Sequence, residues 1–569
     1  MRIFFLLMAW LCILLSSCDQ KSTTNLKQAY VDTSRTYISC SPADLTDKEW
    51  YRSGKKAPLF SGLEGVSFPI TNKNAETQQY FNQGLMLTFG FNHTEAARSF
   101  FEGTRQDSTA AMCWWGLAYV LGRNYNSAIA PGNIKPAYDA VQKAKSIYIN
   151  CTQKEKDLIE ALTYRYSTDT SIAHKVLDSS YAVAMERVYK KYPNDTHVAL
   201  LFAESLMNLH PWKIWKKDGT IQPWTSKIIT VLEKCLQKEP KHAGANHLYI
   251  HAMEASKYPE KALASAARLR DLVPGVGHLV HMPSHIYIRT GRYHEGVVAN
   301  LKAISADSSY IENCYAQNIY PFLYYPHNYH FVAACATLGG ESKKAVKAAQ
   351  EIVGHANKKV VLDKKWEGLQ SFYSIRWYVE VKLGLWKQIL NSVPDKELQY
   401  PTVIWHYAQG MANLSYNKIT TAKEHLSKIK NLVADSNSVS KSNLQQCMIA
   451  YKTLEGEINA KEKNYSTAIV ILKEAVALED FLNYAEPPIW PFSVRHNLGA
   501  VLLEAQQYKV AIQVYHQDLK NYPENGWALR GLMTAYEKIG YQTKYIETKD
   551  RFKKAWKYAD IEISSSRIM

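Results

Sequence analysis

The sequence predicts an all-α fold, a superhelix of repeated helical hairpins (an α-solenoid) that follows an irregular N-terminal segment. From Glu76 onward apolar residues recur with a helical period, and no convincing strand pattern appears. A short turn signature returns along the chain, and a composition of 46% hydrophobic and 21% charged residues is that of a folded protein. Because each repeat contacts only its neighbours, 569 residues need no division into separate globular domains.

The chain begins with a short apolar run that is typical of a secretory signal. In MRIFFLLMAWLCILLSSCDQ the run from Ile3 to Leu15 is too short for a comfortable membrane span. The tetrapeptide LSSC, which ends at Cys18, resembles the lipobox of bacterial lipoproteins, whose cysteine becomes the lipidated first residue. We therefore predict a signal peptide at residues 1–17 and an exported protein, anchored to a membrane of the bacterial cell envelope through Cys18. An ordinary signal peptide with a chance cysteine is the alternative.

The other cysteines do not predict a disulfide framework. Beyond Cys12 and Cys18 they are scattered, odd in number and without a CxxC pair, so we interpret most of them as small buried apolar residues. They are Cys40, Cys113, Cys151, Cys235, Cys314, Cys335 and Cys447.

The net charge of +16 does not predict a nucleic-acid partner. A strongly basic surface attracts nucleic acid or anionic lipid. Here the lysines are interleaved with acidic residues along the chain, as at Lys216-Lys217 and Lys553-Lys554, which indicates a solvated surface. Export also argues against nucleic acid.

Three regions follow the signal peptide. Residues 18–75 are polar and rich in turn-forming residues, as in YRSGKKAPLFSGLEG, and we predict a tether followed by an irregular segment. Residues 76–340 are predicted to form N-terminal helical repeats with a histidine-rich groove. Residues 341–569 are predicted to form C-terminal repeats.

The recurring turn signature joins two helical runs through an aromatic or small residue, with Ala or Gly three positions later. It reads GRYHEGVVANLKAI, KNYSTAIVILKEAV and QQYKVAIQVYHQDL. The small residue lets two helices approach, and the aromatic ring fills the space beside it. This pattern resembles the tetratricopeptide repeat, whose period is about 34 residues, and Tyr508 and Tyr541 stand at nearly that interval.

Longer segments carry a second resemblance. FNHTEAARSF, AMCWWGLAYVLGRN, LFAESLMNLHPWKIW, HMPSHIYIRTGRY, PPIWPFSVRHNLGA and PENGWALRGL are similar to segments of bacterial tetratricopeptide-repeat lipoproteins. The resemblance extends from about Glu76 to Gly540 and implies the fold and export, but no activity.

Histidines recur on three successive helices that tetratricopeptide arrays place along the concave groove. His-x-x-x-His-x-x-Glu spacing stacks side chains on one helical face, and helices packed 8–10 Å apart bring such faces together. The predicted metal-ligating set is His247, His251, Glu254, His281, His285, His327 and His330. His278 lies a further turn back, but if a helix begins at Pro283, His278 and His281 belong to a loop.

Two histidines with a carboxylate suit zinc or iron with open coordination positions. The segment HLYIHAME lacks the glutamate that follows the first histidine in metalloproteases. It also reverses the Glu-x-x-His order of di-iron bundles. The histidines therefore indicate a polar site and a possible divalent metal, without a protease assignment.

Other residues are weaker candidates for the same groove, and each has an alternative role in the core or in hydrogen bonding. The ligand-groove candidates are His93, Trp114, Trp115, Glu204, Arg495 and His496.

The sequence contains no Gly-rich phosphate loop, GxSxG elbow or Cys/His nucleophile signature. We predict a membrane-tethered repeat protein that binds a peptide, protein or small ligand in its groove. The alternatives are a metal-dependent enzyme or metal-handling protein that uses the groove histidines, and a purely structural envelope scaffold.

Overall fold

The computed structural model describes residues 51–52, 54–314, 320–434 and 443–569. The predicted signal peptide and Cys18 lie outside these residues. Within them the regular structure is helical, and β pairing is limited to an isolated bridge between Trp215 and Ile221. The predicted all-α fold, a tetratricopeptide-like array of helices, is confirmed. Among the described residues, no helix is both long and apolar enough to cross a membrane.

The first part of the array contains helices of 10–18 residues. They are α3 (Ala75–Phe89), α4 (His93–Gln106), α5 (Ala111–Leu121), α6 (Ile134–Ile147), α7 (Gln153–Thr163), α8 (His174–Lys191), α9 (Thr196–Leu209), α10 (Thr225–Lys238), α11 (Ala243–Met253) and α12 (Leu263–Leu272).

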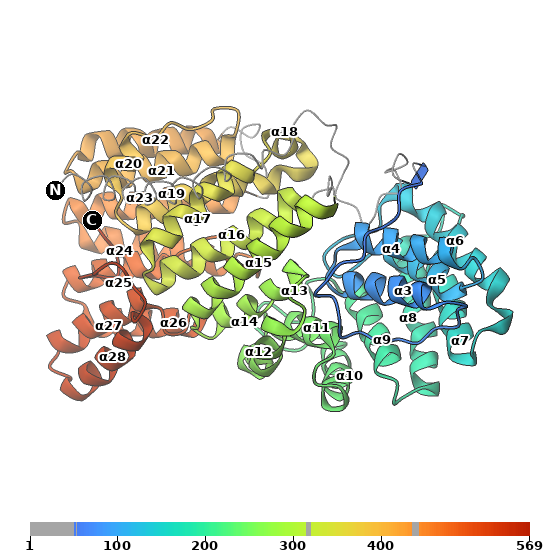
Figure 1. The fold of residues 1–569 in the computed structure, drawn as a ribbon. Coiled ribbons are helices and arrows are strands. Elements are labelled where there is room, and N and C mark those ends of the chain that lie inside the picture. The colour runs from blue at the N-terminus through green and yellow to red at the C-terminus, as the bar shows by residue number, and fades with distance from the viewer. Residues whose placement is uncertain (1–50, 53, 315–319, 435–442) are drawn as a thin grey trace, which may run out of the picture. The chain divides into compact units, whose positions relative to one another are not determined.

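The array continues through α13 (Gly277–His281), α14 (Pro283–Arg289), α15 (Tyr293–Cys314), α16 (Tyr320–Gly339), α17 (Ser342–His355), α18 (Lys358–Leu362), the 3-10 helix η4 (Lys364–Ser374), α19 (Ile375–Lys382), α20 (Trp386–Leu390), α21 (Gln399–Ser415), α22 (Ile419–Ala434), α23 (Leu444–Lys461), α24 (Tyr465–Asp480), α25 (Arg495–Glu504), α26 (Tyr508–Asn521), α27 (Gly526–Lys538) and α28 (Gln542–Ala555). Consecutive helices pack side by side as pairs, as α3 with α4 and α23 with α24 do (Figure 1).

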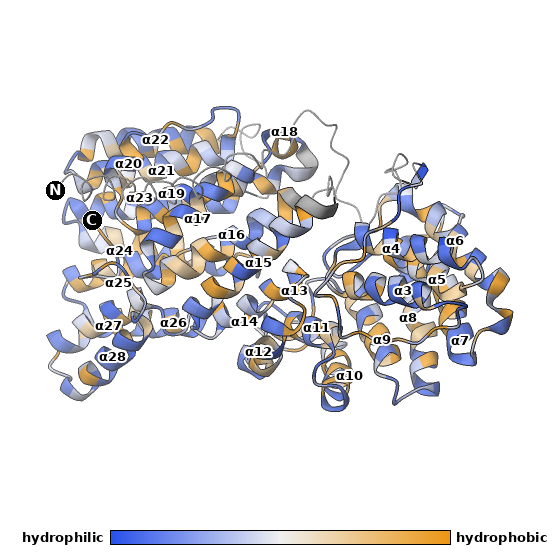
Figure 2. Cartoon of the chain, viewed as in Figure 1, coloured by the Kyte–Doolittle hydropathy of each residue, from blue (hydrophilic) through white to orange (hydrophobic). Residues whose placement is uncertain are grey.

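The hairpins form because the helices are amphipathic and small residues sit at their crossings. Most helices carry both hydrophobic and hydrophilic residues (Figure 2). The ring of Tyr515 on α26 is fully buried against two glycines of the flanking helices, Gly499 on α25 and Gly531 on α27. A Cβ atom added to Gly499 or Gly531 would lie 2.4 Å or 2.1 Å from Cζ of that ring. The predicted partnership of a small residue with an aromatic ring is thus what closes these crossings.

The described part of the irregular N-terminal segment lies on the repeats. The backbone carbonyl of Ala57 accepts a hydrogen bond of 2.9 Å from the hydroxyl of Tyr80 on α3. The backbone N–H of Gly275, before α13, donates to the carbonyl of Gly62 over 3.1 Å. Residues 57–74 therefore cover the helices, and any tether precedes them in the chain.

Two hydrophobic cores meet at α14 and α15. The first is built from residues between Leu63 and Ala299, and the second from residues between Ile288 and Tyr536. The predicted division at residues 340 and 341 falls within the packed pair α16 and α17. The histidine-bearing helices α11, α13, α14 and α16 thus lie where the two cores adjoin.

Candidate metal centre

The path from α13 to α14 keeps a helical geometry through the proline. Met282 has helical dihedral angles (φ −51°, ψ −35°), its N–H donates to the carbonyl of His278 over 3.1 Å, and the N–H of His285 donates to its carbonyl over 3.2 Å. Pro283 occupies the first position of α14, where a missing N–H costs nothing. His278, His281 and His285 consequently lie on successive turns, and their spacing keeps its helical meaning.

The first histidine cluster consists of His247 and His251 on α11 and His278 on α13. One ring nitrogen from each lies within 4.8 Å of the others. Nε2 of His278 is 3.2 Å from Nε2 of His247. All three side chains are buried.

The second histidine cluster consists of His281, His285 and His327, from α13, α14 and α16. Their ring nitrogens also lie within 4.8 Å of one another. Nε2 of His281 is 2.9 Å from Nε2 of His285, and the rings of His281 and His327 are 5.0 Å apart between centroids. His281 and His285 are buried and His327 is half-buried.

Four of these imidazoles are oriented through Nδ1. His247 donates to the carbonyl of Phe89 over 2.6 Å, and His281 donates to Oδ1 of Asn300 over 2.8 Å. His251 and His285 donate to the two oxygens of Glu254, over 3.0 Å and 2.5 Å. Metal-ligating histidines characteristically give their second N–H to a carbonyl or carboxylate in this way.

The amide orientation of Asn300 is set independently, because its Nδ2 donates to the carbonyl of Gly296 over 2.7 Å. Its Oδ1 therefore faces His281, whose Nδ1 must carry the proton. His285 likewise protonates Nδ1 toward Glu254. The lone pairs on Nε2 of His281 and His285 consequently face each other over 2.9 Å, an arrangement that a shared cation would stabilise.

The electrostatics of the site favour neutral imidazoles at four of the histidines and an ionised carboxylate at Glu254. Burial, reinforced by the neighbouring imidazoles, holds the pKa of each of His247, His278, His281 and His327 well below the usual range. Burial alone would raise the pKa of Glu254, but the adjacent His251 and His285 outweigh it and lower that pKa to about 2. Neutral imidazole is the metal-binding form.

Glu254 is placed differently from its predicted role as a ligand. Both of its oxygens accept from Nδ1 atoms, one from each cluster. It therefore lies behind the histidines and connects the two clusters, and the side chains left to bind an ion directly are all imidazoles.

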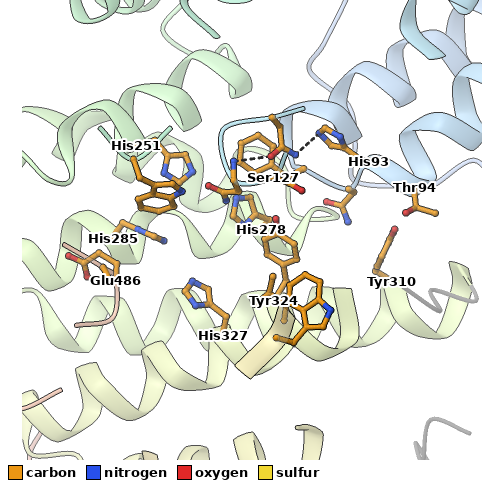
Figure 3. Close-up of a pocket in the computed structure, with 18 of the residues that line it drawn as sticks. His93, Thr94, Ser127, His251, His278, His285, Tyr310, Tyr324, His327 and Glu486 are labelled. Atoms are coloured by element: carbon orange, nitrogen blue, oxygen red, sulfur yellow. Dashed lines mark hydrogen bonds between the residues drawn. The ribbon is translucent and has the colours of Figure 1, made fainter. Parts of the chain in front are cut away.

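A cavity of ≈ 420 Å³ opens onto the two clusters. His251, His278, His285 and His327 line it, and their side chains reach it from four different helices (Figure 3). Nε2 of His251 is buried and makes no hydrogen bond. Both clusters therefore contribute to the wall of one cavity.

Of the other predicted ligands and groove residues, one lines the cavity and the rest lie outside its lining. His93 lines the cavity, donating from Nδ1 to the carbonyl of Val120 over 3.0 Å and accepting at Nε2 from Asn124 over 3.1 Å. His330 lies one turn from His327 but is not among the converging nitrogens, and its ring packs near Phe372. His330 therefore belongs to neither cluster.

Five candidates lie outside the cavity lining. Trp115 is fully buried and donates to the carbonyl of Leu158, and Trp114 packs against the same core. Glu204 is buried and accepts from the hydroxyl of Tyr119. These three side chains serve the packing of the first core.

Arg495 and His496 belong to the second core. Arg495 pairs with Asp480 over 2.6 Å. His496 lies between Asp518, 3.0 Å from Nε2, and Lys382, 2.8 Å from Nδ1. Both side chains therefore make structural hydrogen bonds, which is the alternative role that the sequence predicts for them.

Comparison with known proteins adds no function. No protein-family model matches the chain, and no curated protein matches it in sequence. Solved structures that align with it include the human IFIT1 dimer with PPP-AAAA (13% identity, 87% of this chain and 99% of that chain, TM-score 0.30). Others are APC/C Cut9-Hcn1 (13% identity, 90% and 81% coverage, TM-score 0.29) and yeast Tom70 (10% identity, 82% and 90% coverage, TM-score 0.27). Likeness at this level is too low to transfer a ligand.

Proposed function

We propose that this protein binds transition-metal ions, one at each three-histidine cluster, and presents them to a small ligand in the adjoining cavity. The observation that carries the proposal is the orientation of the imidazoles. Four of them commit Nδ1–H to an oxygen acceptor, so their Nε2 lone pairs are available at the points where the rings converge.

The alternative is that the histidines serve packing alone. A buried polar atom without a hydrogen bond is costly, and a packed histidine normally satisfies both nitrogens. His93 does so, whereas Nε2 of His251 has no partner and Nε2 of His281 faces another nitrogen. Nε2 of His330 is also buried without a partner, but only the clustered imidazoles converge on one another, and this convergence favours a ligand role for them.

The donor set narrows the choice of metal. Imidazoles suit zinc, copper, nickel and iron, and divalent copper binds nitrogen sites most strongly. With Glu254 engaged behind the histidines, the donor set consists of imidazoles and no longer includes the predicted carboxylate. A bound ion would supply a Lewis acid able to polarise an oxygen of the ligand, and the chain's own residues would hold and orient the ion.

Export and lipidation at Cys18 complete the proposal, supported by the lipobox resemblance of LSSC. A protein anchored there would take its metal ions from outside the cytoplasm.

The test is the metal content of the full mature chain, purified without a histidine tag and incubated with zinc or copper. We expect about two ions per chain, and about one after either His247→Ala or His285→Ala. His406→Ala is the matched control, because Nδ1 of His406 lies 2.9 Å from Nδ1 of His425 but this pair belongs to neither cluster. A folded wild type that takes up neither zinc, copper nor iron would overturn the proposal.

A further inference from the structure

The walls of the cavity are those of a site for a small aromatic molecule. Six aromatic side chains line it: Phe91, Trp212, Tyr310, Tyr324, Trp366 and Tyr484. A cavity of about 150 Å³ holds one benzene ring, so ≈ 420 Å³ accommodates one or two rings with substituents. Flat apolar walls with few polar groups are the usual lining of a small-molecule site.

Trp212 is the strongest single indication of a bound ring. Its side chain contributes to the lining although the residue is 45% exposed, and it stands edge-on to His251 with 5.8 Å between ring centroids. Its backbone is in the left-handed region, at φ 58°, which bulky residues rarely adopt. Strain of this kind is retained chiefly at functional sites, and here it holds an indole beside the first cluster.

The polar part of the lining consists of oxygen atoms that need a partner. Oδ1 of Asn92, Oδ1 of Asn126 and Oε2 of Glu486 are buried and make no hydrogen bond. Oε1 of Glu486 accepts from the hydroxyl of Tyr484 over 2.7 Å, which fixes the carboxyl group at the wall. The two amide oxygens match O–H or N–H groups on a ligand, whereas Oε2 of Glu486 carries the proton when the carboxyl is neutral and then matches an acceptor.

In the metal-free chain, the charge of the lining selects against anionic ligands. None of the described lining residues is a lysine or arginine, and Glu486 is the acid among them. Burial raises the pKa of Glu486 to about 8, so its carboxyl is mainly neutral at pH 7. A carboxylate or phosphate would enter this cavity without a cationic side chain to pair with.

We propose that the cavity binds an uncharged one- or two-ring aromatic molecule that carries hydroxyl or amino groups, with its ring against Trp212, its donors toward Asn92 and Asn126, and an acceptor atom toward Glu486. The inference rests on the proposed function, because it names the class of molecule that would lie beside the bound metal ions. The cavity itself is formed by protein side chains, so binding can be measured without metal.

The test is calorimetric titration of the full mature chain, treated with a chelator, with 2-naphthol, naphthalene and 2-naphthoate. We expect 2-naphthol to bind, naphthalene to bind roughly three- to tenfold more weakly because it has no donor, and 2-naphthoate to bind at least about tenfold more weakly. Failure of 2-naphthol to bind, or preference for 2-naphthoate, would overturn the inference.

Variants separate this inference from the metal proposal. Trp212→Ala and Asn126→Ala should each weaken 2-naphthol binding, by at least about tenfold and about threefold, while metal content stays at the wild-type value. Tyr416→Ala is the matched control, because Tyr416 is similarly exposed at 44% and is not part of the lining. Unchanged 2-naphthol affinity in both cavity variants would contradict the site. Loss of metal uptake with intact 2-naphthol binding would contradict the proposed function alone.

Discussion

Glu254 joins His285 through a hydrogen bond of 2.5 Å, between residues 31 positions apart, while its other oxygen accepts from His251. One carboxylate thus fixes the orientation of an imidazole in each cluster. The two clusters are coupled through this residue, so a change at Glu254 should affect both.

Replacement of Glu254 by glutamine tests this coupling. Glutamine offers one acceptor oxygen in place of two, so one of the two imidazoles loses its orienting partner. We expect metal affinity to fall about 10- to 100-fold, as is typical for loss of an outer partner, in a competition titration against a chelator. Glu341→Gln is the control, because Glu341 accepts from Nδ1 of His294 over 3.0 Å away from both clusters. Equal affinities for wild type and Glu254→Gln would show that the carboxylate does not orient the ligands.

Asn300 should act on the second cluster only. Asn300→Leu removes the acceptor for His281 at a fully buried position, and we expect about one ion per chain together with a loss of roughly 1–3 kcal/mol of stability. Asn300→Asp, which restores an acceptor for His281, should recover part of the second ion. A variant that is destabilised yet keeps both ions would assign Asn300 a structural role only.

Metal binding should stabilise the folded chain. An ion that binds the folded state adds about 2.7 kcal/mol when its free concentration is 100 times its Kd. Differential scanning calorimetry should therefore show a higher Tm with zinc or copper than with chelator, and a smaller difference for His278→Ala. The same Tm difference in His278→Ala as in wild type would exclude His278 from the ligands.

The crossing at Tyr515 predicts the cost of a larger side chain. Gly531→Ala places a Cβ atom where the ring of Tyr515 already lies, so we expect a loss of about 1–3 kcal/mol from overpacking in denaturant unfolding. Gly354→Ala on α17 is the matched control, since no atom lies within 4 Å of the added Cβ. That variant should be neutral or more stable by up to about 1 kcal/mol. Equal stability of the two variants would contradict the packing described.

Stability should also depend on pH through Glu479. Burial raises the pKa of Glu479 from 4.5 to about 7, so between these values the folded chain keeps a proton that the unfolded chain releases. The free energy of unfolding should therefore fall as pH rises through this window, by roughly 1–3 kcal/mol. Glu479→Gln should remove this component of the fall, whereas Glu474→Gln, at an exposed position of the same helix, should not. A wild-type slope retained in Glu479→Gln would place the titration elsewhere.

Helical periodicity and the turn signature were enough to predict the fold, because each hairpin packs through local contacts that the sequence pattern records. The two histidine pairs on α11 and across Pro283 could be recognised from spacing of four residues. His278 lies three residues before His281, a further turn back on the same helical path, but Pro283 obscured the helical continuity that Met282 provides. Spacing alone could not tell that His330, three residues after His327, turns away.

Contacts between distant segments could not be predicted from one sequence. Asn300 and the carbonyl of Phe89 become partners of histidines only through the packing of α15 and α3 against the histidine-bearing helices. Trp115 and His496 were predicted for the groove but lie in the core. The sequence pattern of an aromatic or polar residue on a helix is the same in both locations.

Tyr484 and Glu486 reach the cavity from a loop between α24 and α25, far along the chain from His327, the last of the clustered histidines. A fragment that stopped at residue 480 would keep every histidine of both clusters and yet lack one wall of the chamber beside them. If the clusters hold metal and the cavity holds the ligand, as proposed, substitutions in this loop would change ligand selection while leaving every clustered histidine in place.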